Sequence, residues 1–240
     1  MYTGETRINY YDLDFNGNIK LSALLRMVHI AAEVNANQLN IGFETLHPLH
    51  ISFVIQRFGV KVTRMPKYNE TVTIRTWPAD TSRGTFTRKG DMYDQEGNKL
   101  MEWASLWILF DTKNRKILKP SALPLPIPAL DDIPVDITPQ KVVIPSEATV
   151  LSDHTHTVRY ADVDTNMHMN NSIYGDLIGN AAFATDISQD KNIAEIQINF
   201  TGETTFGDQI KITASTCGDT VFVYGATYEK SSLAASIVFK

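Results

Sequence analysis

One stretch of the chain concentrates side chains that can move protons or make several hydrogen bonds. The segment RYADVDTNMHMNNSIYGDLIGN, residues 159–180, gathers aspartates, asparagines and a histidine and leads directly into an apolar run. A glutamate follows in INFTGET, residues 198–204. An imidazole and a carboxylate that meet beside a substrate are a common pair for general acid–base chemistry. The residues singled out here are Asp164, Asn166, His168, Asn170, Asn171 and Glu203.

A related segment, NYYDLDFNGNIKLSALLRMVHI, occurs near the N-terminus at residues 9–30. Farther along, NETVTIRT aligns with GDQIKITA at an offset of 138, so the first copy has about twelve extra residues within NIGFETLHPLHIS. The chain is therefore an internal repeat. At an offset of 150 the aligned pairs are Tyr160 with Tyr10, Asp162 with Asp12, Asp164 with Asp14, and Asn166 with Asn16.

Positions that differ between the copies are the informative ones. His168 aligns with Asn18, and Glu203 aligns with Met65 through the offset of 138. The second copy thus has an imidazole and a carboxylate where the first has an amide and a thioether. We expect His168 and Glu203 to form a functional pair.

Residues kept in both copies are open to a structural interpretation. We interpret Asp12 and Asp162 as loop or capping carboxylates. Asp164 and Asn166 also have counterparts, so a catalytic role must be weighed against turn formation, for which both residue types are suited.

The elements that must position these residues follow the same repeat. Helical patterns at residues 21–39 and 172–187 follow the polar segments, and asparagine and serine just ahead are good caps. Strand patterns follow at 51–65, 70–79, 84–94 and 99–111, and again at 193–203, 208–216, 220–230 and 233–240. Each half reads as a strand, a helix and four antiparallel strands. The predicted fold is α+β, a tandem double hot-dog in which each long antiparallel sheet wraps around a central helix.

The segment between the halves is rich in proline and is not expected to form a central strand or helix. The predicted organisation is an N-terminal hot-dog at residues 1–119, an extended linker at 120–149 and a C-terminal hot-dog at 150–240. If the second copy catalyses, the first is free to bind substrate.

Composition limits the function classes. The chain has 240 residues, of which 43% are hydrophobic and 20% charged, as in ordinary globular proteins. Its single cysteine, Cys217, rules out an intramolecular disulfide framework, and no metal-ligand spacing, phosphate loop or nucleic-acid motif occurs. No apolar run reaches the roughly 18 residues of a membrane span, and the N-terminus resembles neither a secretion signal nor a transit peptide. We expect a cytoplasmic protein without cofactor or metal that binds neither nucleic acid nor membranes.

The residues quoted above resemble a known family. DVDTNMHMNNSIY with INFTGET is similar to the active-site region of acyl-acyl carrier protein (acyl-ACP) thioesterases, and YDLDFNGNI, FGVKVTRMPKYNETVTIRTW and ASLWILFD resemble that family's substrate-binding half. The resemblance implies hydrolysis of fatty acyl-ACP in fatty acid biosynthesis. Plant members often have a cysteine beside the acidic residue, whereas this chain has Thr204. A thiol nucleophile is thus excluded there. The N-terminus, which lacks the character of a transit peptide, favours a bacterial member over a plastid one.

The needs of thioester hydrolysis, an activated water and a stabilised oxyanion, lead to a hypothesis for the roles of these residues. Glu203 would activate water as a general base, Asp164 would orient its neighbours, and Asn166 with His168 would orient the carbonyl or the water. Unpaired backbone N–H groups at the start of the 172 helix would polarise the thioester carbonyl. Which carboxylate takes the proton, and whether a carboxylate attacks directly to form an anhydride, stays open. The expected substrate contacts are Asn170 and Asn171. Trp103 and Trp107 share one strand face and are candidates for the walls of an acyl-chain pocket, with plain core packing as the alternative for each.

Charge is distributed in a way that fits the implied partner. Residues 1–120 contain 16 basic and 12 acidic side chains, a balance of +4, whereas residues 121–240 contain 6 and 15, a balance of −9. A basic half would steer the strongly acidic carrier protein. The basic residues on or beside its strands are Arg57, Lys61, Arg64, Lys67, Arg83, Arg88 and Lys89.

Other functions remain compatible with these residues. They are an acyl-CoA thioesterase of the hot-dog class, a hot-dog dehydratase and a non-catalytic acyl-binding module. The chain could be a monomer, since the fused halves already pair, or a homodimer through its sheet edges.

Overall fold

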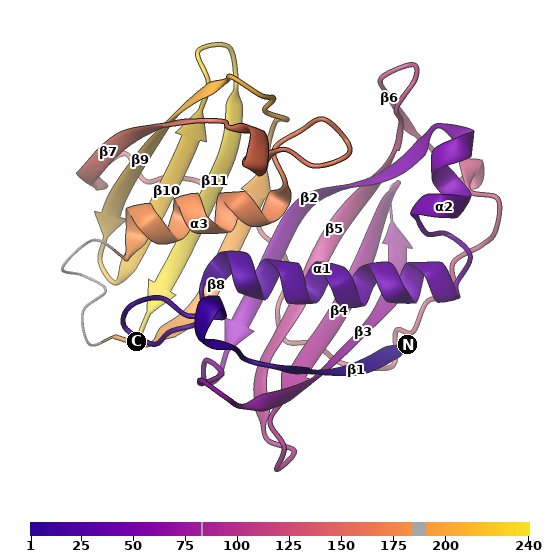
Figure 1. Cartoon of the computed structure of the whole chain (residues 1–240), viewed down its shortest axis with the longest axis horizontal. Helices are drawn as coiled ribbons and strands as arrows, with labels where there is room; N and C mark the ends of the chain where they lie inside the picture. Colours follow the sequence, from indigo (N-terminus) through magenta and orange to yellow (C-terminus); the bar gives the residue numbers. More distant parts are fainter. Residues whose placement is uncertain (83, 184–190) are drawn as a thin grey trace. The chain divides into compact units, whose positions relative to one another are not determined.

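The computed structural model describes residues 1–82, 84–183 and 191–240. It divides into two compact units that interleave in sequence (Figure 1). Unit 1 comprises Met1–Asn9 and Met27–Pro139, and unit 2 comprises Tyr10–Arg26 and Gln140–Lys240. The functional domains proposed at 1–119 and 150–240, with a linker at 120–149, stay a prediction.

Unit 1 is an antiparallel sheet in the order β1-β3-β4-β5-β2, with β6 paired to β5. Its helix is α1, Leu21–Gln38, which belongs to this unit from residue 27 onward (Figure 1). The extra residues of the first copy form the short helix α2 and a 3-10 turn between α1 and the sheet. The bounds are β1 Tyr2–Arg7, α2 Phe43–Leu46, η2 His47–Leu49, β2 Ile51–Val62, β3 Thr71–Ser82, β4 Thr85–Tyr93, β5 Lys99–Asp111 and β6 Lys116–Leu118.

Unit 2 repeats this build with the order β8-β11-β10-β9-β7, again antiparallel. Helix α3, Asn171–Ala182, contacts β7, β9, β10 and β11 (Figure 1). The unit also holds the 3-10 turn η1, Tyr10–Asp12, and the first six residues of α1. The other bounds are β7 Thr149–Thr157, η4 Tyr160–Asp162, β8 Ile193–Phe200, β9 Gln209–Cys217, β10 Thr220–Ala226 and β11 Ser231–Phe239.

Alternate residues are buried in strands β9 and β10, as period-two strands with one helix-facing side require. In β9, Ile210, Ile212 and Ala214 have no exposed surface, whereas Gln209 and Lys211 between them are exposed. The predicted tandem hot-dog architecture is confirmed. The first helix begins at residue 21 as predicted; the second begins at 171 rather than 172, and the end predicted at 187 lies outside the described residues.

The proline-rich segment contains one short 3-10 turn, η3 at Pro120–Ala122, and is held to the sheets by side chains. In unit 1 the backbone N–H of Asp136 donates to Oε1 of Glu102 at 3.1 Å. In unit 2 the N–H of Gln140 donates to Gln197 at 2.9 Å, and Asn199 Nδ2 donates to the Gln140 carbonyl at 2.8 Å. Glu102 of β5 and Gln197 and Asn199 of β8, all buried, therefore find hydrogen-bond partners in the connecting segment.

No helix among the described residues is long and apolar enough to cross a bilayer.

Candidate active site

The polar loop ahead of α3 is closed by its own backbone. The N–H of Asp164 donates to the His168 carbonyl at 3.0 Å, the Met167 N–H donates back to Asp164 at 3.0 Å, and the Asn170 N–H donates to Asp162 at 2.8 Å. The first copy makes the same three bonds with every residue number lowered by 150. These are Asp14 to Asn18 at 2.8 Å, Gly17 to Asp14 at 3.0 Å and Lys20 to Asp12 at 2.9 Å. The shared residues therefore build a loop, whichever copy performs chemistry.

The carboxylate of Asp164 is occupied within this loop. One oxygen accepts from the backbone N–H of Asn166 at 2.8 Å, and the other accepts from Asn170 Nδ2 at 3.0 Å. Asn170 in turn caps α3, because its Oδ1 accepts from both the N–H and the hydroxyl of Ser172, at 2.9 and 2.8 Å. The geometry shows turn formation by Asp164 and helix capping by Asn170. Their predicted catalytic and substrate-binding roles stay predictions.

The first copy lacks this asparagine cap. Lys20 stands at the position of Asn170, and its Nζ donates to the Tyr11 carbonyl at 3.2 Å. Ser22, the counterpart of Ser172, is 1% exposed, and its hydroxyl has no partner among the described residues. The two loops thus share a backbone and differ in the side chains that lead into the helix.

His168 and Glu203 lie side by side, as the sequence comparison predicted. His168 Nε2 is 3.2 Å from Oε2 of Glu203, and the two side chains are 29% and 31% exposed. A backbone bond brings their segments together, since the Met169 N–H donates to the Thr204 carbonyl at 2.7 Å. The pair is therefore within hydrogen-bonding reach and open to a substrate from solvent.

Thr204 and Tyr174 form a buried clamp behind Glu203 that sequence reasoning missed. Thr204 has no exposed surface, Tyr174 is 3% exposed, and their hydroxyl groups are 2.9 Å apart. Burial raises the pKa of the tyrosine, so the phenol is neutral near pH 7. The comparison of the two copies could have revealed Tyr174, because the first copy has Leu24 at the corresponding position and so lacks the hydroxyl.

Backbone strain marks the residue just before the imidazole. Met167 has a φ of 64°, in the left-handed region, where the first copy has Gly17 with a φ of 80°. A non-glycine residue there carries a conformational cost of order 1–3 kcal/mol, which is found most often at functional sites.

The helix start offers fewer donors than predicted. The N–H groups of Ser172 and Ile173 are both taken by Asn170, through its side chain and its carbonyl. The expectation of unpaired N–H groups was therefore wrong for Ser172 and Ile173, because the N-cap residue satisfies both. Asn166 lies exposed at the loop tip, and neither its side chain nor that of Asn171 makes a hydrogen bond in the described part of the chain.

The two tryptophans lie in unit 1 on the side of β5 that faces α1. Trp103 is fully buried. Trp107 is partly exposed, its Nε1 donates to Ser105 at 2.8 Å, and its ring lies edge-on to that of His29 on α1, 6.0 Å between centres. Their assignment as walls for an acyl chain stays a prediction.

Part of the basic charge of unit 1 is already neutralised. Arg64 pairs with Glu70 at 2.7 Å and with Asp94 at 3.2 Å, and Lys61 pairs with Asp136. Arg83 lies outside the described residues. No group of three histidine, cysteine or acidic side chains suited to a metal ion occurs in residues 1–82, 84–183 and 191–240.

Two family models cover most of the sequence. The N-terminal domain of acyl-ACP thioesterases matches residues 1–121, and the C-terminal domain matches residues 146–235. The chain belongs to the acyl-ACP thioesterase family. The His168–Glu203 pair falls within the part that matches the family's C-terminal domain.

Individual relatives agree with this family. A chloroplastic acyl-[acyl-carrier-protein] hydrolase, FATB2, of Cuphea viscosissima is 29% identical over 140 residues, which is 51% of this chain and 31% of the relative. A chloroplastic palmitoyl-acyl carrier protein thioesterase of Cuphea hookeriana is 28% identical over 128 residues. The matches thus span about a third of the length of these curated relatives.

Solved structures share the fold over the whole chain. An acyl-ACP thioesterase from Bacteroides thetaiotaomicron superposes with a TM-score of 0.84 at 20% identity, covering 99% of this chain and 97% of that one. The 12:0-ACP thioesterase from Umbellularia californica gives 0.82 at 19% identity, covering 100% and 96%.

Proposed function

We propose that this chain hydrolyses the thioester between a fatty acyl chain and acyl carrier protein, which releases the free fatty acid and ends chain elongation. The observation that carries the proposal is the contact between His168 and Glu203. It occurs in the repeat that matches the family's C-terminal domain, and both residues are absent from the corresponding positions of the first copy.

The chemistry needs only water and these side chains. Glu203 takes a proton from a water molecule that adds to the thioester carbonyl carbon, and His168 orients that water or the carbonyl by a hydrogen bond. The tetrahedral adduct then breaks its C–S bond, and the proton held by Glu203 passes to the departing sulfur, which restores the carboxylate and releases the thiol. Asp164 and Asn170 hold the loop, and Asn166 and Asn171 are available for substrate because their side chains are unbonded within the described residues.

A covalent thiol route has no support in this chain. The residue beside Glu203 is Thr204, whose hydroxyl is buried against Tyr174, and the single cysteine, Cys217, ends strand β9. Direct attack by the Glu203 carboxylate is the competing route. It requires a mixed anhydride that water then cleaves.

Replacing Glu203 by glutamine tests the assignment. Loss of a positioned general base lowers kcat by roughly 100- to 10,000-fold, while circular dichroism and the melting temperature should stay at wild-type values. Glu195→Gln on β8 is the matched control, because it makes the same chemical change in the same unit and should leave kcat intact. Near-normal turnover by Glu203→Gln would remove Glu203 from the mechanism.

The carrier is tested by a panel of substrates with matched acyl chains on acyl carrier protein and on coenzyme A. A basic N-terminal half favours the acidic carrier protein. A higher kcat/KM on coenzyme A across the panel would assign the chain to acyl-CoA hydrolysis instead. Stoichiometric acyl binding without turnover would identify a binding module.

A further inference from the structure

An arginine lies between the helix and the sheet of unit 1 without an anionic partner. Arg88 of β4 donates through Nη1 to Oδ1 of Asn35 on α1 at 2.9 Å, and it lies 3.4 Å from the hydroxyl of Thr76 on β3. Asn35 is 1% exposed and Thr76 has no exposed surface. Within the described residues no carboxylate pairs with this guanidinium. Burial lowers the pKa of Arg88 to about 10, which leaves it charged near pH 7.

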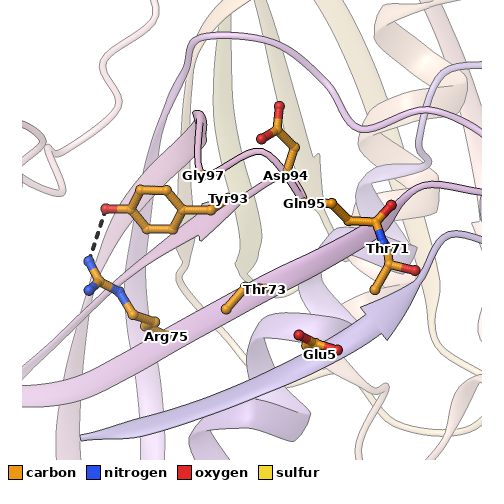
Figure 2. Close-up of a pocket in the computed structure, with 8 residues that line it drawn as sticks. All are labelled: Glu5, Thr71, Thr73, Arg75, Tyr93, Asp94, Gln95 and Gly97. Atoms are coloured by element: carbon orange, nitrogen blue, oxygen red, sulfur yellow. Dashed lines mark hydrogen bonds between the residues drawn. The ribbon is translucent and has the colours of Figure 1, made fainter.

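On the outer face of the same sheet, by contrast, an arginine has an anionic partner. Figure 2 shows Arg75 of β3 beside a polar surface hollow, with its guanidinium bonded to the Tyr93 hydroxyl at 2.9 Å. Arg75 also makes a two-pronged pair with Asp91, at 2.8 and 2.6 Å, and this pairing raises its pKa. The cation on the outer face is thus neutralised within the sheet, whereas the one on the inner face is not.

Further polar groups lie beside the main chain of Arg88 on the same face of the sheet. Ser105 of β5 donates to the Arg88 carbonyl at 3.3 Å and accepts from Trp107 Nε1 at 2.8 Å. The Trp107 ring meets His29, whose Nε2 is buried without a partner among the described residues. Arg88, Trp107 and His29 each keep a small accessible surface. An interior that contacts only hydrocarbon would leave the polar atoms of Arg88 and His29 without hydrogen-bond partners from the ligand.

The free-energy cost of burying the Arg88 guanidinium indicates that a bound molecule supplies a further hydrogen-bond acceptor. Burying a charge without an opposite charge costs several kcal/mol, and proteins usually avoid this by pairing the group. A neutral amide and a hydroxyl, both reached through one nitrogen, compensate only part of a guanidinium that has five N–H donors. An oxygen atom on a bound molecule would supply the remainder.

We propose that Arg88 selects acyl chains that carry an acceptor oxygen along their length, as a hydroxyl or a carboxylate group, over plain hydrocarbon chains. The inference rests on the proposed function, since it assigns the acyl chain to the first repeat. It makes Arg88 a specificity-determining residue rather than part of a docking surface for the carrier.

The test compares acyl-ACPs of one chain length: the unsubstituted chain, hydroxyacyl chains with the hydroxyl at successive carbons, and the chain ending in a carboxylate. At the best position the oxygenated chain should exceed the plain chain in kcat/KM by about 10-fold or more, the usual size of a hydrogen bond to a charged group. Arg88→Met should abolish that ratio. Lys89→Met removes a positive charge from the next residue, which points to the opposite sheet face, and should keep it.

Two further measurements keep the result decisive. Arg88→Lys is the variant to use if Arg88→Met is unstable. It keeps the positive charge but loses the planar fork of donors, so it should fold and retain part of the kcat/KM ratio between oxygenated and plain chains. Binding of the free oxygenated and plain acids, followed by tryptophan fluorescence, decides the inference even if no thioester is hydrolysed. Equal affinity and turnover for plain and oxygenated chains at every position, or an unchanged ratio in Arg88→Met, would overturn it.

Discussion

Replacing Gly175 of α3 by alanine is expected to destabilise unit 2 by about 2 kcal/mol, the balance of two opposing effects. A Cβ atom there would lie 2.6 Å from the backbone nitrogen of Ser22 and 2.8 Å from the carbonyl carbon of Leu21. Both are backbone atoms of the first turn of α1, so no side-chain rotation relieves the overlap. Reaching an ordinary contact of 3.4 Å requires the helices to separate by about 0.8 Å. Such overpacking costs up to roughly 3 kcal/mol, and the better helix propensity of alanine returns about 1 kcal/mol.

The same helix provides the control. A Cβ at Gly179 would meet only the Phe183 ring, at 3.6 Å, which is an ordinary contact. Gly179→Ala should therefore gain about 1 kcal/mol from helix propensity alone. In urea unfolding and thermal scans, with roughly 2–4 °C per kcal/mol at this size, Gly175→Ala should melt about 4–8 °C lower and Gly179→Ala about 2–4 °C higher. Equal shifts in the two variants, or a Gly175→Ala protein as stable as wild type, would refute the close approach of the helices.

Two remaining predictions concern buried polar groups. Tyr174→Phe leaves the Thr204 hydroxyl without its partner at 2.9 Å, which should lower the free energy of unfolding by roughly 1–3 kcal/mol. Because Glu203 is then held less firmly, kcat should fall with little change in KM. An unaltered kcat would contradict the clamp. Burial lowers the pKa of His29 from 6.5 to about 4, so the unfolded chain binds a proton in that window that the folded chain does not. The resulting stability, roughly 3 kcal/mol, is fully present above pH 6.5 and lost as pH falls to about 4. His29→Gln should lack this slope in denaturation series across the window, and equal slopes in both proteins would count against it.

The repeat explains why so much of the fold could be predicted. Two aligned copies fix which strands and helices correspond, and period-two burial then orients each sheet. The comparison also located His168 and Glu203, since a residue gained in one copy cannot be needed by the shared loop. The extra residues of the first copy were found as an insertion, but their folding into α2 and η2 carried no clear sequence signal.

Other parts of the site depend on tertiary contacts that a sequence does not display. Tyr174 sits in an apolar run and looks like an ordinary core residue until Thr204 is placed against its hydroxyl. Arg88 was grouped with surface cations, although it shares its strand parity with the buried residues Phe86 and Met92. The capping role of Asn170 removed donors from a helix end that residue types alone left free.

The missing cap in the first copy limits how the protein can be engineered. Grafting a histidine in place of Asn18 would put an imidazole on a loop with the right backbone, but Lys20 follows it and the Ser22 hydroxyl has no partner among the described residues. A bifunctional enzyme with two reaction centres would first need an asparagine at position 20 to tie the transplanted loop to its helix. The repeat therefore provides two loops with the same backbone, and only the second has the asparagine cap that ties the loop to the helix after it.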